Sequence, residues 1–156
     1  GDYLANYDIR TDEEIEADES AKPPWPSWVK EEDLPSVIDS AAGNVELEIT
    51  ARRLWWMAQN DAFRKLYRQH KESSPDTFPT FIATDAQKEN MLKLAYLLED
   101  RYSTPWLEVA EICREVGDMQ AASKALSLAG KSNETLSEVM RQLIELNYSG
   151  PVRFRY

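Results

Sequence analysis

The sequence contains few of the residues that build metal sites and disulfide frameworks. Its 156 residues include one Cys, one His and five Gly, which excludes a disulfide scaffold, a zinc finger and a His-rich metal site. No GxGxxG or P-loop glycine pattern is present. No apolar run approaches the roughly 18 residues of a membrane span, and no signal peptide opens the chain. We therefore expect no membrane partner and a reducing intracellular location, in the cytoplasm or the nucleus.

The charged residues are distributed unevenly along the chain. The sequence has 18 basic and 28 acidic residues, for a formal net charge of −10. Residues 1–34 hold 11 of the acids and 3 of the bases, whereas residues 35–156 hold 17 acids and 15 bases. This split predicts an acidic, largely disordered N-terminal arm with a Pro/Trp linker over residues 1–34, and a helical domain over residues 35–156.

The acidic arm also carries apolar and aromatic side chains. Residues 12–19 contain six acids, and Tyr3, Tyr7 and Ile15 lie among or before the acidic positions. Such a segment either stays solvated or folds when it binds a basic, apolar groove. The second interpretation predicts that Tyr3, Tyr7 and Ile15 contact a protein partner with a basic or apolar surface.

A proline-rich segment follows the arm. Residues 22–28 read Lys-Pro-Pro-Trp-Pro-Ser-Trp, and we call this segment the strap. Its prolines favour an extended polyproline helix, in which Trp25 and Trp28 fall on the same side. The two indoles either pack on the core of this chain or anchor a partner.

From residue 34 onward the apolar spacing is helical, and it predicts an all-α, compact bundle of five to six helices with a short extended C-terminal tail over residues 152–156. Thr84 with Gln87 forms a predicted capping box, while Thr104, Asp118 and either Ser132 or Asn133 are the predicted N-caps of later helices. The predicted helices cover residues 34–42, 45–70, 84–101, 105–116, 119–129 and 134–146.

The long helix over residues 45–70 has two distinct predicted faces. Its apolar stripe, predicted to face the core, consists of Leu47, Ala51, Leu54, Ala58, Ala62 and Leu66. Basic residues give it a polar face, which predicts a second docking surface for an acidic partner or for the chain's own arm. The residues assigned to this surface are Arg52, Arg53, Arg64 and Arg68.

The residues most able to do chemistry have simpler structural interpretations. His70 ends a helix, where a cation suits the helix dipole, and Cys113 lies on an apolar helix stripe. Glu108, Glu111 and Glu115 share one side of a helix with no Glu-x-x-His partner for a two-metal site, so we predict a solvated charged face. We predict no catalytic residue, no metal, no cofactor and no enzymatic activity.

Two segments resemble known motifs. Residues 106–129 resemble one tetratricopeptide repeat, with Trp106 opening the first helix, Gly117-Asp118 at the turn, and Ala122 and Ala129 in the second helix. Because solenoids need about three repeats and only one copy is present, we interpret the segment as an antiparallel helix pair.

Residues 119–156 resemble a helix-turn-helix followed by a wing. This resemblance implies nucleic-acid binding, although residues 121–156 carry a net charge of only +2 and the phosphate backbone favours a basic surface. The implied nucleic-acid contacts are Lys131, Asn133, Arg141, Arg153 and Arg155.

The preferred hypothesis is a non-catalytic helical interaction or assembly domain that uses the arm and strap, with Trp25 and Trp28 as anchors on a protein partner. One alternative is a helix-turn-helix regulator or packaging protein that binds nucleic acid. Another is a viral or phage structural subunit, for which a homo-oligomer is expected.

Overall fold

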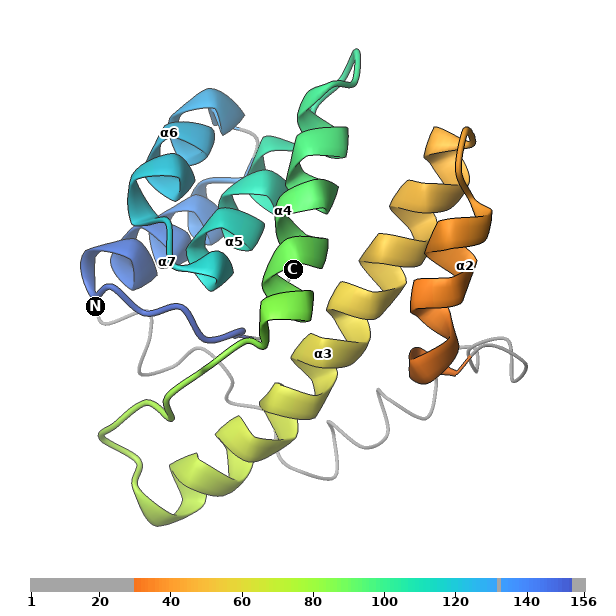
Figure 1. Cartoon of the computed structure of the whole chain (residues 1–156). Coiled ribbons are helices and arrows are strands. Elements are labelled where there is room, and N and C mark those ends of the chain that lie inside the picture. The colour runs from red at the N-terminus through yellow and green to blue at the C-terminus, as the bar shows by residue number, and fades with distance from the viewer. Residues whose placement is uncertain (1–29, 132, 153–156) are drawn as a thin grey trace.

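The computed structural model describes residues 30–131 and 133–152. In these residues the chain forms six α-helices after a short 3-10 turn, and no strand (Figure 1). This confirms the predicted all-α class and number of helices. The arm, the strap and tail residues 153–156 lie outside the described residues. The elements are η1 (Glu31–Asp33), α2 (Leu34–Ser40), α3 (Val45–Ser73), α4 (Asp85–Glu99), α5 (Trp106–Val116), α6 (Met119–Ala129) and α7 (Glu134–Glu145).

The helices begin where their capping residues predict. The Thr84 hydroxyl accepts from the Gln87 amide at 3.1 Å, and the Gln87 side chain returns the bond to the Thr84 amide at 2.9 Å. Asp118 and Asn133 each accept from the backbone amide three residues ahead, which starts α6 and α7. Gly117 ends α5 with a φ of 96°, a left-handed conformation that glycine adopts without strain.

The predicted role of Thr104 as an N-cap is wrong. Pro105 is the residue that precedes α5, and it makes no capping bond through its side chain. The Thr104 hydroxyl instead donates to the carbonyl oxygens of Glu99 and Arg101, both at 3.3 Å. Thr104 therefore satisfies acceptors left at the end of α4, which is the other local use of a threonine hydroxyl.

Helix α3 lies between α2 and the remaining helices (Figure 1). A turn with Gly43 at φ 87° reverses the chain after α2, so α2 and α3 run antiparallel. Helix α4 packs on both α3 and α5, while α5 and α6 make the most extensive helix pair and α7 packs beside them. The C-terminal part of α3 continues well beyond the N-terminal end of α2 (Figure 1).

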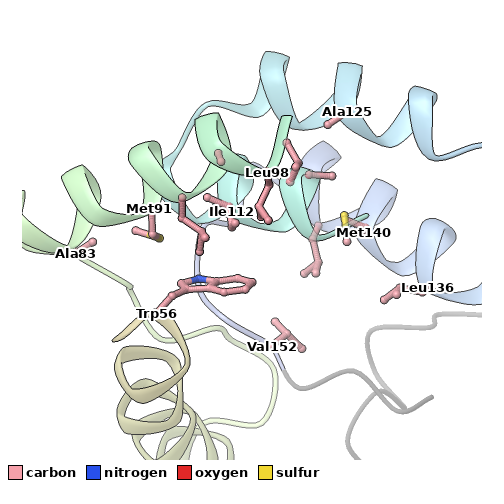
Figure 2. Packing of buried hydrophobic residues seen from close by; sticks show 14 of the residues in the cluster. Trp56, Ala83, Met91, Leu98, Ile112, Ala125, Leu136, Met140 and Val152 are labelled. Atoms are coloured by element: carbon pink, nitrogen blue, oxygen red, sulfur yellow. The ribbon is translucent and has the colours of Figure 1, made fainter. Parts of the chain in front are cut away.

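The hydrophobic core lies mainly between α4, α5 and α7. Figure 2 shows Trp56 of α3 projecting toward the side chains of Met91 and Ile112, with Met140 and Val152 in the same cluster. Burial of these apolar side chains is the main favourable term for the fold. The completely buried members are Met91, Leu94, Leu98, Val109, Ala110, Ile112, Met140 and Leu143.

The core-facing side of α3 differs from the predicted stripe. Leu47 and Leu66 of that stripe are 44% and 59% exposed, whereas Ile49 and Trp56 enter the core. Ala51 is buried but does not belong to the core cluster. The prediction that this stripe faces the core is therefore wrong, because α3 turns Ile49 and Trp56 toward the bundle instead.

The chain after α7 folds into a turn against the loop that follows α3. The Tyr148 ring contacts the Phe78 ring with centroids 4.8 Å apart, and the Tyr148 hydroxyl donates to the Pro79 carbonyl at 3.0 Å. The same ring covers Gly150, where a Cβ would lie 2.2 Å from the Tyr148 Oη atom. This position therefore requires glycine.

Candidate functional site

Polar and charged side chains join α3 to α4 and α5, and we call this layer the polar seam. Long side chains join α3 to α5, which do not pack directly on one another, whereas α3 and α4 are in direct contact. The seam was not predicted as a unit, because its members are separated by up to 59 residues in the sequence. They are Arg52, Arg53, Trp56, Asn60, Arg64, Asn90, Glu108, Glu111, Arg114 and Glu115.

Glu115 is the centre of the polar seam and is 2% exposed. The Trp56 indole Nε1 donates to its Oε2 at 2.5 Å, and the Asn60 Nδ2 donates to its Oε1 at 3.0 Å. Both donors come from one face of α3, four residues apart. Burial raises the pKa of Glu115, against the opposing effect of the Arg114 charge and these two hydrogen bonds.

Glu111 lies one turn before Glu115 and interacts with it. Burial, followed by the Glu115 charge, raises the pKa of Glu111 to about 8. The charges of Arg114 and Arg64 act in the opposite direction, and the hydrogen bond between the two carboxyl groups favours a protonated Glu111. The pair therefore holds a proton near neutral pH, as two close carboxyl groups commonly do.

Arg114 connects the polar seam to the end of the bundle. It is completely buried, and its Nη1 donates to the carbonyl oxygens of Tyr148 at 2.7 Å and Gly150 at 2.8 Å. Its charge also lowers the pKa values of both seam glutamates. One side chain thus fixes the C-terminal turn and offsets part of the buried negative charge.

The outer part of the seam contains two arginines of α3. Arg52 is 6% exposed and donates to Glu48 at 2.9 Å and to Asn90 at 3.1 Å, while the Asn90 amide returns a bond to the Arg52 carbonyl. Arg53 makes a bidentate pair with Glu108 at 2.7 and 2.9 Å. The hydrogen bond with Glu108 raises the pKa of Arg53.

The prediction of a solvated glutamate face on α5 is wrong. Glu115 is buried and Glu108 pairs with Arg53, so this face packs on α3. Burial and the neighbouring Glu115 charge raise the pKa of Glu111, which favours one shared proton on the pair. Both oxygens of Glu115 accept from α3 side chains, an arrangement that links two helices.

The arginines assigned to a docking surface on α3 are engaged within the chain. Arg52 is buried and Arg53 pairs with α5, while Arg64 pairs with Asp61 at 2.9 Å. Arg68 is half-buried and also has an interaction within the molecule. Their contact with a partner stays a prediction, and the remaining predicted partner-binding residues, Tyr3, Tyr7, Ile15, Trp25 and Trp28, lie outside the described residues.

The residues implied by the helix-turn-helix resemblance are not gathered into a basic surface. Lys131 is exposed, and Asn133 uses its side chain to cap α7. Arg141 is the basic residue of α7, and it pairs with both Glu138 and Glu145. Arg153 and Arg155 lie outside the described residues. A phosphate would have to compete with two glutamates for Arg141.

His70 and Cys113 both make contacts typical of structural residues. The His70 Nε2 lies 2.7 Å from the Thr77 hydroxyl, which ties the end of α3 to the following loop. Cys113 is partly buried, and burial raises its pKa to about 11. Because a thiolate is the nucleophilic form, this raised pKa favours the protonated thiol at neutral pH.

The members of the seam that sequence reasoning missed share one signal. Trp56 and Asn60 are four residues apart on α3, and Glu111 and Glu115 have the same spacing on α5. Two helical faces with matching polar spacing are complementary when the helices pack side by side. That reading requires knowledge of which helices are neighbours, and the sequence alone does not provide it.

No family model, no curated protein and no solved structure matches this chain. Within residues 30–131 and 133–152, no group of three or more His, Cys, Asp or Glu side chains is placed to hold a metal ion. No helix in the same part of the chain has the length and apolar character needed to cross a bilayer.

Proposed function

We propose that this chain is a non-catalytic protein-interaction domain, in which the acidic arm binds a partner with a basic or apolar surface. The titratable groups of the polar seam support this proposal, because they bond to one another across helices. The arm supports it from the sequence: its six acids over residues 12–19 provide long-range attraction, and Tyr3, Tyr7 and Ile15 provide apolar contact area.

The outer face of α4 is the observation that carries the proposal. Leu92 and Tyr96 are four residues apart on that helix and are 55% and 71% exposed. The opposite face of α4 is in the core, where Met91, Leu94 and Leu98 are completely buried. Leu92 and Tyr96 therefore form an exposed apolar pair on the otherwise charged outer surface of α4, and an exposed tyrosine beside a leucine is typical of protein-binding surfaces.

An affinity capture with matched variants tests the proposal. The baits are the full chain, a chain lacking residues 1–20, and the double variant Leu92→Ser with Tyr96→Ser. A control variant, Leu128→Ser, replaces an equally exposed leucine of α6. Retained proteins are identified and quantified by mass spectrometry, and circular dichroism checks that each bait is folded.

We expect at least one retained protein to fall more than tenfold with the truncated chain or the α4 variant, and to stay unchanged with the Leu128→Ser control. Binding of the same purified protein to the full chain should then weaken as salt rises, because the arm contributes charge. Equal capture by all four baits would overturn the proposal. Light scattering on the isolated chain separates a partner protein from a second copy of this chain.

A further inference from the structure

Part of α3 presents an apolar face that α2 does not reach. Ala51, which α2 covers, is buried, and Ala62 lies eleven residues later, which is three turns along the same face of the helix. Ala62 is exposed, and Leu66, one turn further, is 59% exposed. We call Ala58, Ala62 and Leu66 the α3 stripe.

The described chain begins at the place from which this stripe can be reached. Helix α2 runs antiparallel to α3, so its first residue points toward the C-terminal part of α3 (Figure 1). Lys30 precedes η1 and α2, and one residue, Val29, separates it from the strap. The chain therefore enters α2 from the direction of the C-terminal half of α3, the half that carries the α3 stripe.

The dimensions of the strap match those of the stripe. A polyproline helix rises about 3.1 Å per residue, so Trp28 and Trp25 lie roughly 6 and 15 Å along the chain from Lys30. The α3 stripe from Ala58 to Leu66 is about 12 Å long, at 1.5 Å per residue. In that conformation one polyproline turn would separate the two indoles, a spacing that fits within the length of the stripe.

Charge complementarity favours a strap that runs along α3 toward the C-terminal end of that helix. Residues 64–71 of α3 contain four basic residues and no acid, and residues 12–19 of the arm contain six acids and no base. A strap that follows α3 toward its C-terminus carries the acidic residues toward the basic ones.

We propose that the strap docks in cis on the α3 stripe, with Trp25 and Trp28 covering Ala62 and Leu66. This inference is independent of whether the arm binds a partner.

Paramagnetic relaxation enhancement on the full chain tests the docking. A nitroxide is attached to Lys65→Cys, an exposed position beside the stripe, in a chain with Cys113→Ser so that the label is unique. We expect the amide and indole signals of residues 24–29 to lose more than half of their intensity. The matched control carries the nitroxide at Leu128→Cys on α6 and should leave these signals unchanged.

Two further measurements make the outcome decisive. Leu66→Asp should restore the signals in the Lys65→Cys chain, because a carboxylate on the stripe disfavours indole burial. A sample in which the nitroxide and the isotope label are on different chains should show no broadening. Full intensity beside the Lys65→Cys label would overturn docking on the stripe. Broadening in the mixed sample would overturn docking in cis and indicate exchange between two copies.

Discussion

Two neighbouring parts of the α5 surface are attached to the rest of the bundle by different interactions. Val109 and Ile112 are completely buried in the apolar core. Beside them, Glu108 and Glu115 accept hydrogen bonds from donors on α3. Truncation of one apolar side chain leaves a cavity in the core and lowers the free energy of unfolding, but it leaves no polar group unpaired. A buried polar contact leaves unpaired groups behind when one partner is removed. The polar seam should therefore be the more specific attachment and the more sensitive one.

The largest effect is expected for Arg114→Ala. This substitution removes the donor to two backbone carbonyls and the positive charge near Glu111 and Glu115. Breaking a buried charged network typically costs about 3–5 kcal/mol of unfolding free energy. Urea unfolding followed by circular dichroism measures it. Arg141→Ala removes only surface ion pairs and should cost far less, because solvent screens exposed charges. Equal losses for the two variants would contradict a special role of the seam.

A pH dependence of stability is the next largest effect. Because the pKa of Glu111 is raised from 4.5 to about 8, the folded chain keeps a proton that the unfolded chain loses as pH rises. The stabilisation is complete below the ordinary pKa and is lost as pH rises through about 8. The free energy of unfolding should fall by an amount on the order of 2–4 kcal/mol between pH 5 and pH 9.

Glu111→Gln should flatten that pH profile, because its amide does not titrate. The exposed Glu72→Gln is the control, and it should leave the profile as in the unmodified chain. Leu143→Ala, in the apolar core, should lower stability by a similar amount at every pH. A profile that rises from pH 5 to pH 9 in the unmodified chain would show that Glu111 is ionised in the folded state.

A smaller effect is expected from the bond between Asn60 and Glu115. Glu115→Leu leaves the Asn60 amide and the Trp56 indole without their acceptor, whereas Asn60→Leu leaves Glu115 with one donor fewer. The double variant removes both members of the bonded pair. The free energy of unfolding of the double variant should be about 1–2 kcal/mol higher than the value obtained by adding the losses of the two single variants. Strict additivity would mean that this hydrogen bond contributes nothing.

The smallest effect is expected for the ion pair between Arg53 and Glu108, which is partly exposed. Arg53→Gln should cost about 0.2–1 kcal/mol, and the difference from the unmodified chain should shrink in high salt because solvent ions screen exposed charges. Thermal unfolding at low and high salt measures both quantities. A loss larger than that of the Asn60 and Glu115 variants would reverse the expected order within the seam.

The sequence predicted the helices well because their boundaries depend on local residues. Thr84 with Gln87, Asp118, Asn133 and Gly117 act on amides or φ angles within a few positions. The same local reasoning assigned Thr104 to the wrong helix, because a threonine hydroxyl next to two helix ends can serve either one.

The candidate site could not be predicted in the same way. Periodicity treats apolar residues as interior and charged residues as exterior, so Arg52 and Glu115 were expected at the surface and Arg114 was not singled out. Their burial depends on partners 34–59 residues away in the chain. The apolar spacing of α3 identified a helix, but it assigned the wrong face to the core, because the face that meets the bundle depends on which helices are neighbours.

The Tyr148 ring over Gly150 has a consequence for sequence variation. In a library randomised at this position, we expect selection for the folded chain to return glycine alone, since even an alanine methyl group would displace the aromatic ring. The displacement would break the hydrogen bond from the Tyr148 hydroxyl to the Pro79 carbonyl. It would also shift the Gly150 carbonyl, which accepts a hydrogen bond from Arg114. The absence of a Cβ atom at Gly150 thus preserves the turn after α7, and with it the hydrogen bonds that this turn accepts from the buried Arg114 side chain.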